Sequence, residues 1–230
     1  MKNRRSSPYN SREHGFELSY KLTCEQLAKI SDMEEQCRKS GAKYLEPNEI
    51  AIDYLNQPYH IILPRDILSC HCEADVISQS NLVEVALRDK ILMLHYFTMA
   101  KGTPPTGILI TYKQLPGGMN YFPAFFQRAI NPLVKHFGQN PELLVSKAAK
   151  LGGDKADYGD ASVTINAFSH VPITLVLWRG DEEVAPNGNI LFDANISDYL
   201  STEDVTVLTE TIIWKLVKDT SSAQPQCSLK

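Results

Sequence analysis

The residues with the clearest potential for proton-transfer chemistry are one histidine and a pair of neighbouring carboxylates. His95 can accept or release a proton near neutral pH, and Asp181 and Glu182 could act beside it as acids or metal ligands. This combination predicts a small-molecule enzyme. The alternative for His95 is structural, because a single histidine on an apolar helix, here beside Tyr96, is more often a hydrogen-bonded core residue.

Arg128, Tyr121 and Trp178 indicate binding rather than proton transfer. Arg128 lies in a helical pattern that is otherwise rich in phenylalanine, so its guanidinium must meet either a carboxylate such as Asp181 or an anionic ligand. Tyr121 precedes Arg128 by two helical turns. Trp178 ends an apolar strand just before a group of carboxylates, which suits an interface anchor or a pocket wall.

Cys70, His71 and Cys72 form the one local concentration of soft metal ligands in the sequence. In a strand the two cysteines point to one face and the histidine to the other, so the three cannot converge on one ion. The other cysteines supply no second pair at a spacing typical of zinc or iron–sulfur sites. The sequence therefore favours structural cysteines and no metal, and loss of a bound metal on mutating Cys70 and Cys72 would overturn this.

Residues 152–204 hold ten acidic residues and two basic ones. Such a segment could supply oxygen ligands to a hard cation, or dock a basic partner, or form a solvated rim. Its spacing matches no calcium-binding loop. The acidic residues are Asp154, Asp157, Asp160, Asp181, Glu182, Glu183, Asp193, Asp198, Glu203 and Asp204.

The stretch from His95 to Arg128 reads HYFTMAKGTPPTGILITYKQLPGGMNYFPAFFQR. Its glycines and prolines fix a backbone shape, and shaped connections on rigid elements often carry binding sites. We expect a helix over residues 82–99, a strand over 108–115 and a helix over 122–137, which Pro132 should kink or divide. The polar residues of this stretch could then share one cleft.

The remaining elements form clusters of strands separated by groups of helices. We expect a helix from Cys24 to about Gly41, with Thr23 as its N-cap, and an antiparallel meander over residues 49–77. A helix over 141–151 should precede strands at 161–168, 172–178 and 189–196 and a last amphipathic helix from Ser201. The pattern predicts an α+β fold with antiparallel sheets in a single compact unit at 16–219, between disordered ends at 1–15 and 220–230.

The composition indicates an ordinary globular protein. The 230 residues are 43% hydrophobic and carry a formal net charge of −4, which argues against general nucleic-acid binding. No apolar run approaches the length that crosses a bilayer, and no signal peptide is recognisable. With five scattered cysteines, these features predict a cytoplasmic protein with reduced thiols. Phosphate-binding loops, nucleophile elbows and metalloprotease motifs are absent from the sequence.

An ordered series of motifs gives a resemblance to a known family. LHYFTMAKGTPPTG, QLPGGMNYFPAFFQR, LGGDKADYGDAS and VPITLVLWRGDEE resemble domain-of-unknown-function family 3786, found mainly in anaerobic bacteria and archaea, over residues 20–218. Some members look fused to a four-cysteine iron–sulfur domain similar to that of the corrinoid iron–sulfur protein of one-carbon metabolism. This chain lacks the four-cysteine motif, so redox chemistry would have to come from a partner.

Two hypotheses follow. The first, which we favour, is an accessory protein of anaerobic metabolism that binds a cofactor or a partner such as a corrinoid or iron–sulfur protein; the cofactor is unidentified, and the resemblance leaves a corrinoid or other tetrapyrrole open. The second is the small-molecule enzyme, with a small-molecule ligand. The predicted binding residues are His95, Tyr96, Tyr121, Arg128, Trp178, Asp181 and Glu182.

Overall fold

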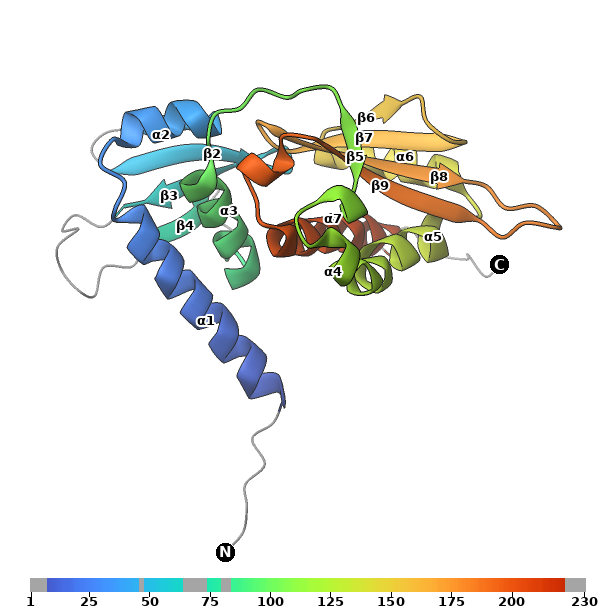
Figure 1. Ribbon diagram of the computed structural model, residues 1–230, viewed down its shortest axis with the longest axis horizontal. Helices are drawn as coiled ribbons and strands as arrows, with labels where there is room; N and C mark the ends of the chain where they lie inside the picture. The colour runs from blue at the N-terminus through green and yellow to red at the C-terminus, as the bar shows by residue number, and fades with distance from the viewer. Residues whose placement is uncertain (1–7, 46–47, 64–73, 80–83, 222–230) are drawn as a thin grey trace, which may run out of the picture. The chain divides into compact units, whose positions relative to one another are not determined.

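The computed structural model describes residues 8–45, 48–63, 74–79 and 84–221, and the chain forms two compact units, residues 1–103 and 104–230. The α+β class with antiparallel sheets is confirmed. Whether both units behave as the single domain predicted for residues 16–219 stays a prediction. The elements of each unit are labelled in Figure 1.

The first unit combines three helices with an antiparallel four-stranded sheet in the order β1-β2-β3-β4. Helix α1 packs against α3. Leu55 and Asn56 both have positive φ in the β2–β3 hairpin, the backbone that a two-residue turn between twisted strands requires. The elements are α1 (Pro8–Leu27), α2 (Met33–Ser40), β1 (Lys43–Leu45), β2 (Glu49–Tyr54), β3 (Gln57–Ile62), β4 (Asp75–Ser78) and α3 (Leu87–Met99).

The helix predicted from Cys24 to Gly41 is two helices. Thr23 is no N-cap, because it lies inside α1 and its hydroxyl donates to the carbonyl of Ser19 at 2.7 Å. The cap of α2 is Asp32, whose carboxylate accepts from the N–H of Glu35 at 2.9 Å. Helix α1 already begins at Pro8, within the predicted disordered terminus, while residues 1–7 lie outside the described part.

The second unit is built on an antiparallel five-stranded sheet in the order β5-β9-β8-β7-β6. The central strand β8 is buried over most of its length: Ile173, Leu175 and Leu177 are completely buried, and the intervening Thr174 and Val176 are buried as well. The strands are β5 (Leu109–Thr111), β6 (Gly153–Ala156), β7 (Ala161–Phe168), β8 (Val171–Trp178) and β9 (Asn187–Asp193).

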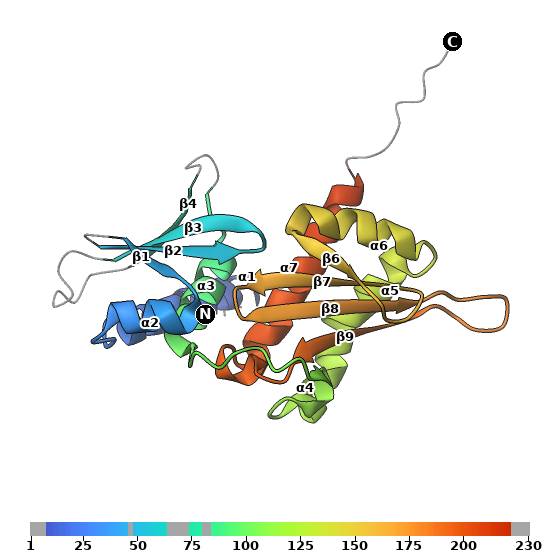
Figure 2. The same cartoon turned by 90° about the horizontal axis from the view of Figure 1, so that it is seen from above.

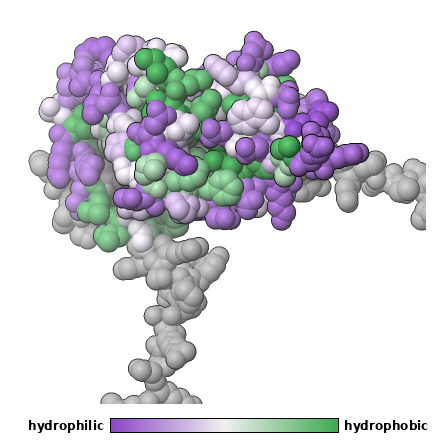
Figure 3. Space-filling model, turned by 45° about the vertical axis from the view of Figure 1, so that its right-hand side comes forward, coloured by the Kyte–Doolittle hydropathy of each residue, from purple (hydrophilic) through white to green (hydrophobic). Residues whose placement is uncertain are grey.

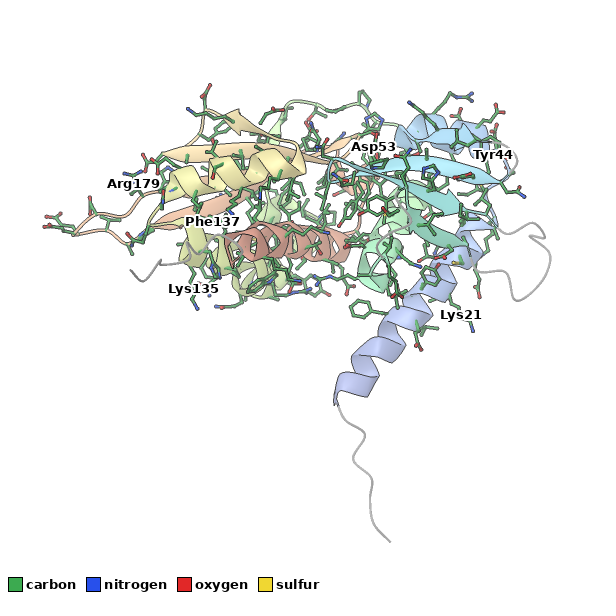
Figure 4. All side chains as sticks on the ribbon, turned by 180° about the vertical axis from the view of Figure 1, so that it is seen from behind. Lys21, Tyr44, Asp53, Lys135, Phe137 and Arg179 are labelled. Atoms are coloured by element: carbon green, nitrogen blue, oxygen red, sulfur yellow. The ribbon has the colours of Figure 1, made fainter. Side chains whose placement is uncertain are left out.

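Helices cover one face of this sheet, as Figures 1 and 2 show. Helix α6 contacts β6 and β7, and α5 contacts β9 and α7. On α5, Phe137 is completely buried, whereas Lys135 extends on the side away from the sheet (Figure 4). The helical elements are η1 (Tyr112–Gln114), α4 (Gly118–Phe125), η2 (Phe126–Ile130), α5 (Asn131–Phe137), α6 (Pro141–Ala148), η3 (Ala149–Leu151), η4 (Ile196–Asp198) and α7 (Thr202–Ser221).

The strand predicted over residues 108–115 is shorter than expected. It ends at Thr111, because the Gln114 side chain accepts from the N–H of Thr111 at 2.8 Å and turns the chain into η1. Strand β6 and strand β1 are additional to the predicted ones. The predicted helix over 122–137 is divided into α4, η2 and α5.

Candidate functional site

The Gly/Pro connection after α3 is held in shape by a buried carboxylate in β9. The oxygens of Asp193 accept from the N–H of Thr106 at 2.9 Å, the hydroxyl of Thr106 at 2.8 Å and the N–H of Gly107 at 2.7 Å. Burial alone would raise the pKa of Asp193, but these hydrogen bonds outweigh it and lower the pKa. The shape of this connection is therefore a structural requirement.

The turn before α4 consists of Pro116, Gly117 and Gly118 and is called the PGG turn; its backbone conformation is also tightly constrained. Gly117 has a φ of 71°, a left-handed backbone that glycine adopts without a Cβ clash. A Cβ on Gly118 would lie 2.0 Å from the carbonyl oxygen of Tyr112, so only glycine fits. The turn thus sets where α4 begins.

Tyr112 anchors α4 to the rest of the second unit. Its ring stacks on Phe125 with centroids 3.9 Å apart, and its hydroxyl lies 2.8 Å from the hydroxyl of Thr206 on α7. The hydroxyl of Thr202 donates to the carbonyl of Pro116 at 2.8 Å. Helix α4 is therefore held at both its preceding turn and its C-terminal end.

A π turn joins α4 to α5. Pro132 has no N–H to donate to the carbonyl of Arg128, and its ring would clash with that carbonyl in a regular α-helix. The N–H of Asn131 instead donates to the carbonyl of Phe126, five residues back. The single helix predicted over 122–137 is thus divided just before Pro132, and Arg128 lies in the π turn. Such turns are frequent at functional sites.

Helix α4 exposes an apolar surface. Its sequence GMNYFPAF contains no charged residue, yet the helix buries only Gly118 and Phe125. Met119 is 67% exposed and Tyr121 64%, and Phe126 in the following turn is 37% exposed. We call Met119, Tyr121, Phe122, Pro123 and Phe126 the α4 face. Hydrophobic residues that reach the surface among hydrophilic ones are visible in Figure 3.

Cations flank the α4 face. The ammonium of Lys113 lies 4.2 Å from the ring centroid of Phe122. Arg128 donates from Nε and Nη2 to Oε2 of Glu210 at 3.1 and 2.6 Å. The carboxylate that Arg128 meets is therefore Glu210 and not the predicted Asp181, because α7 packs beside the π turn.

The end of the β8–β9 hairpin holds three more of the predicted binding residues, Trp178, Asp181 and Glu182. Asp181 accepts from the N–H groups of Glu183 and Val184 at 2.9 and 2.7 Å, and these hydrogen bonds lower its pKa. Its carboxylate therefore organises the loop. Trp178 is 41% exposed and Val184 63%.

The neighbouring β6–β7 turn belongs to the same end of the sheet. The N–H of Asp160 donates to the carbonyl of Leu177 at 2.9 Å, and the N–H of Arg179 donates to Asp160 at 2.7 Å. The guanidinium of Arg179 pairs with Glu142. We call residues 157–160 together with 178–184 the acidic tip.

His95 and Tyr96 lie in the first unit, on α3. The Tyr96 side chain is completely buried and donates to the carbonyl of Ser40 at 2.6 Å, and its part in a binding site stays a prediction. His95 is partly buried and makes interactions of its own. His95 belongs to one unit and Asp181 and Glu182 to the other, so these three residues form no acid–base site within a unit.

A pocket among the described residues of the first unit lacks the residues predicted to bind a tetrapyrrole. A pocket of 440 Å³ in the first unit is lined by Tyr20, Asp75, Glu84, Lys90 and apolar neighbours, and it includes no histidine and none of the predicted binding residues. Volumes of about 300–1,000 Å³ suit drug-sized ligands, and a tetrapyrrole is larger than most of these.

Metal ligands do not gather in the part of the chain that the structure describes. No three His, Cys, Asp or Glu side chains there could hold one ion. Cys24 and Cys37 are buried and form no disulfide bond within the described residues, and burial raises the pKa of Cys37 to about 11. Cys70 and Cys72 lie outside the described residues. No helix among the described residues has the length and apolar character to span a membrane.

Comparison with known proteins places the chain in a family. A family model named domain of unknown function (DUF3786) matches residues 32–215. The chain belongs to the DUF3786 family. No curated protein and no solved structure matches it. The description of the DUF3786 family assigns no activity to its members.

Sequence reasoning named Tyr121 and Arg128 as predicted binding residues but gave no role to the exposed apolar residues beside them, Met119, Phe122 and Phe126. Large apolar side chains usually point inwards, so their type does not indicate exposure. One signal could have found them. Residues 114–127 carry no charge. A helix in a single layer buries only one of its faces, so an uncharged helix there must leave apolar side chains exposed on the other face.

Proposed function

We propose that this DUF3786 protein is a cytoplasmic accessory protein that binds a partner protein through the α4 face. The observation that carries the proposal is the exposure of an uncharged helix: α4 buries two of its residues and leaves Met119 and Tyr121 largely exposed. Exposed apolar side chains on one side of a helix, here Met119, Pro123 and Phe126 at helical spacing, are typical of an interaction site.

The composition of the α4 face supports a protein partner. Aromatic residues, methionine and arginine are enriched in protein interfaces, and Tyr121, Phe126 and Arg128 are of these types. Tyr112 and the PGG turn hold the helix in place before any partner arrives. A rigid surface loses little conformational entropy on binding.

The resemblance noted from the sequence makes a corrinoid or iron–sulfur protein of anaerobic one-carbon metabolism the first partner to test. A directly bound tetrapyrrole has less support, because Tyr96 is part of the core and Arg128 is paired with Glu210. The enzyme alternative also has less support, since the carboxylate of Asp181 is engaged in its own turn.

The test is affinity capture from anaerobically grown cells with two variants. Met119→Ser combined with Phe126→Ser removes apolar area from the α4 face, and Ile108→Ser removes an exposed apolar side chain outside both the α4 face and the acidic tip. We expect a protein that the wild type and Ile108→Ser retain and that the α4 variant loses. Identical sets of captured proteins for all three would contradict the proposal.

A further inference from the structure

Strand β9 begins with Asn187 and Gly188, which form the only Asn–Gly pair in the sequence. Asn187 is exposed and Gly188 is buried. The backbone nitrogen that follows an asparagine can attack the side-chain amide and close a cyclic imide. Glycine hinders this attack least, because it has no Cβ.

The two groups that would react are already in contact. The N–H of Gly188 donates to Oδ1 of Asn187 at 2.8 Å. Oδ1 and Cγ belong to one planar amide group, so the side-chain carbonyl is turned towards the nitrogen that would attack it. Groups that are held together react without first losing the entropy of an encounter.

The N–H of Gly188 is bonded to a side chain and not to a neighbouring strand. Strand β5 pairs with β9 only over Leu191–Asp193, beyond this position. Closing the imide removes the N–H of Gly188 and replaces its contact with Asn187 by a covalent bond. The reaction therefore does not have to break a hydrogen bond of this N–H to another strand.

Asn187 also lies at the end of the β8–β9 ladder. Trp178 and Asn187 form the last pair of the ladder, and Leu177 and Gly188 form the pair before it. The hairpin beyond this pair extends past the end of the sheet (Figure 2). Ring closure needs a rotation about the Cα–C bond of Asn187, and the ends of elements open at the lowest cost in free energy.

Asn189 provides an internal comparison. The N–H of Ile190 donates to Oδ1 of Asn189 at 2.9 Å, so the starting contact is similar. Ile190 is completely buried and β-branched, and Asn189 pairs with Val176 inside the ladder. Ring closure there would have to move a packed core side chain, so Asn189 should react far more slowly.

We propose that Asn187 undergoes spontaneous deamidation through a cyclic imide with Gly188. A hydroxide ion takes the proton of the Gly188 nitrogen, this nitrogen bonds to Cγ of Asn187, and the Cγ–Nδ2 bond breaks. Nδ2 takes a proton from water and leaves as ammonia, which regenerates the hydroxide. Water then opens the ring at either of its carbonyl carbons and leaves an aspartate or an isoaspartate. In total one water molecule is consumed and one ammonia is released.

Both products change the end of the β8–β9 hairpin. Each adds a carboxylate at the position paired with Trp178, on a hairpin that already carries Asp181, Glu182 and Glu183. Isoaspartate also lengthens the main chain by one carbon atom, which disturbs the register of this last pair. Asn187 is not part of the α4 face, so this inference is independent of the proposed function.

Peptide mass spectrometry of the full chain, kept folded at mildly alkaline pH, tests the proposal. In water labelled with heavy oxygen, residue 187 should gain one labelled oxygen atom and appear as both aspartate and isoaspartate. Fragmentation of the peptide separates residue 187 from residue 189. The rate at residue 187 should exceed that at residue 189 about ten-fold or more.

Two variants serve as controls, and circular dichroism checks that each is folded. Asn187→Gln keeps an exposed amide but would need a larger ring, so residue 187 should stay unchanged. Asn189→Gln should leave the rate at residue 187 as it is in the wild type. Gly188→Ala is unsuitable, because its Cβ would lie 2.9 Å from Cγ2 of Val134 and could disturb the fold.

Two outcomes would overturn the proposal. One is a folded chain in which residue 187 stays asparagine for as long as residue 189 does, since the strand would then prevent ring closure. The other is conversion to aspartate without isoaspartate, since direct hydrolysis of the side chain would then replace the imide.

Discussion

Tyr112 stacks almost flat on Phe125, with ring centroids 3.9 Å apart and ring planes inclined by 8°. Phe125 also contacts Phe192 of β9, with centroids 6.2 Å apart. Phe125 is thereby the residue that joins α4 to the sheet, while the rest of the helix remains largely exposed. The position of the α4 face depends on this anchor together with the PGG turn, which Thr202 holds through the carbonyl of Pro116.

Truncating the anchor should cost far more than truncating its neighbour. Phe125→Ala removes a completely buried ring and should lower the free energy of unfolding by about 3–5 kcal/mol. Phe126→Ala is the matched control, and because its ring is partly exposed we expect a loss below about 1 kcal/mol. Urea unfolding measures both, and equal losses would contradict the assigned roles.

The PGG turn should accept no side chain at its second glycine. Gly118→Ala places a Cβ against the backbone carbonyl of Tyr112 and should destabilise the fold by about 3 kcal/mol, the upper part of the usual overpacking range. Gly15→Ala is the control, since no atom lies within 4 Å of its Cβ in α1. Thermal unfolding should show the control slightly more stable than the wild type.

The Asp193 carboxylate should stabilise the protein in a pH-dependent way. Asp193→Asn should cost about 1.5–3 kcal/mol at neutral pH, the usual range for hydrogen bonds to a charged group. The pKa of Asp193 is lowered in the folded state, so its contribution is complete above the unfolded value of about 3.9 and is lost as the pH falls through the folded value.

Chemical unfolding at about pH 7 and about pH 3 measures this difference between wild type and Asp193→Asn. The difference should shrink at the lower pH, because the Asp193 carboxyl of the unfolded chain, with a pKa of about 3.9, is then largely protonated. Asp157→Asn, an exposed carboxylate of the acidic tip, controls for general charge effects. A loss that is the same at both pH values would show that the charge on Asp193 is not what holds the connection.

The π turn should depend on Pro132. In Pro132→Ala residue 132 gains an N–H that can donate to the carbonyl of Arg128, so the helix can become regular. Hydrogen exchange followed by NMR should find this new amide protected. An exchange rate typical of an exposed amide would mean that the packing of α7, rather than the missing N–H, causes the π turn.

The fold could be predicted from the sequence wherever one local rule dominated. The alternation in residues 161–168 and 172–178 gave strands close to β7 and β8, and Pro141 marked the start of α6. Boundaries failed where a side chain intervened. Asp32 capped a second helix inside the predicted one, and Gln114 ended β5 early by bonding to Thr111. Such contacts depend on which of several nearby polar side chains forms the hydrogen bond to the backbone.

The candidate site was less predictable, because the partner of a side chain depends on distant packing. Arg128 was expected to meet either a carboxylate such as Asp181 or an anionic ligand, and it meets Glu210, which lies 82 residues further along the chain. Tyr96 looked like a cleft residue and is a core hydrogen-bond donor to Ser40. Exposure of Met119 could not be deduced from its type, since apolar residues on helices are normally read as buried.

Covalent surface labelling of the α4 face tests the central claim most directly. Met119, Tyr121 and Phe126 are labelled in the isolated protein and in the complex captured from anaerobically grown cells, with Ile108 as an exposed residue outside the face. We predict strong protection of the three α4 residues in the complex and unchanged labelling of Ile108. Equal labelling of Met119, Tyr121 and Phe126 in the free and the captured protein would contradict a partner-binding role for the α4 face.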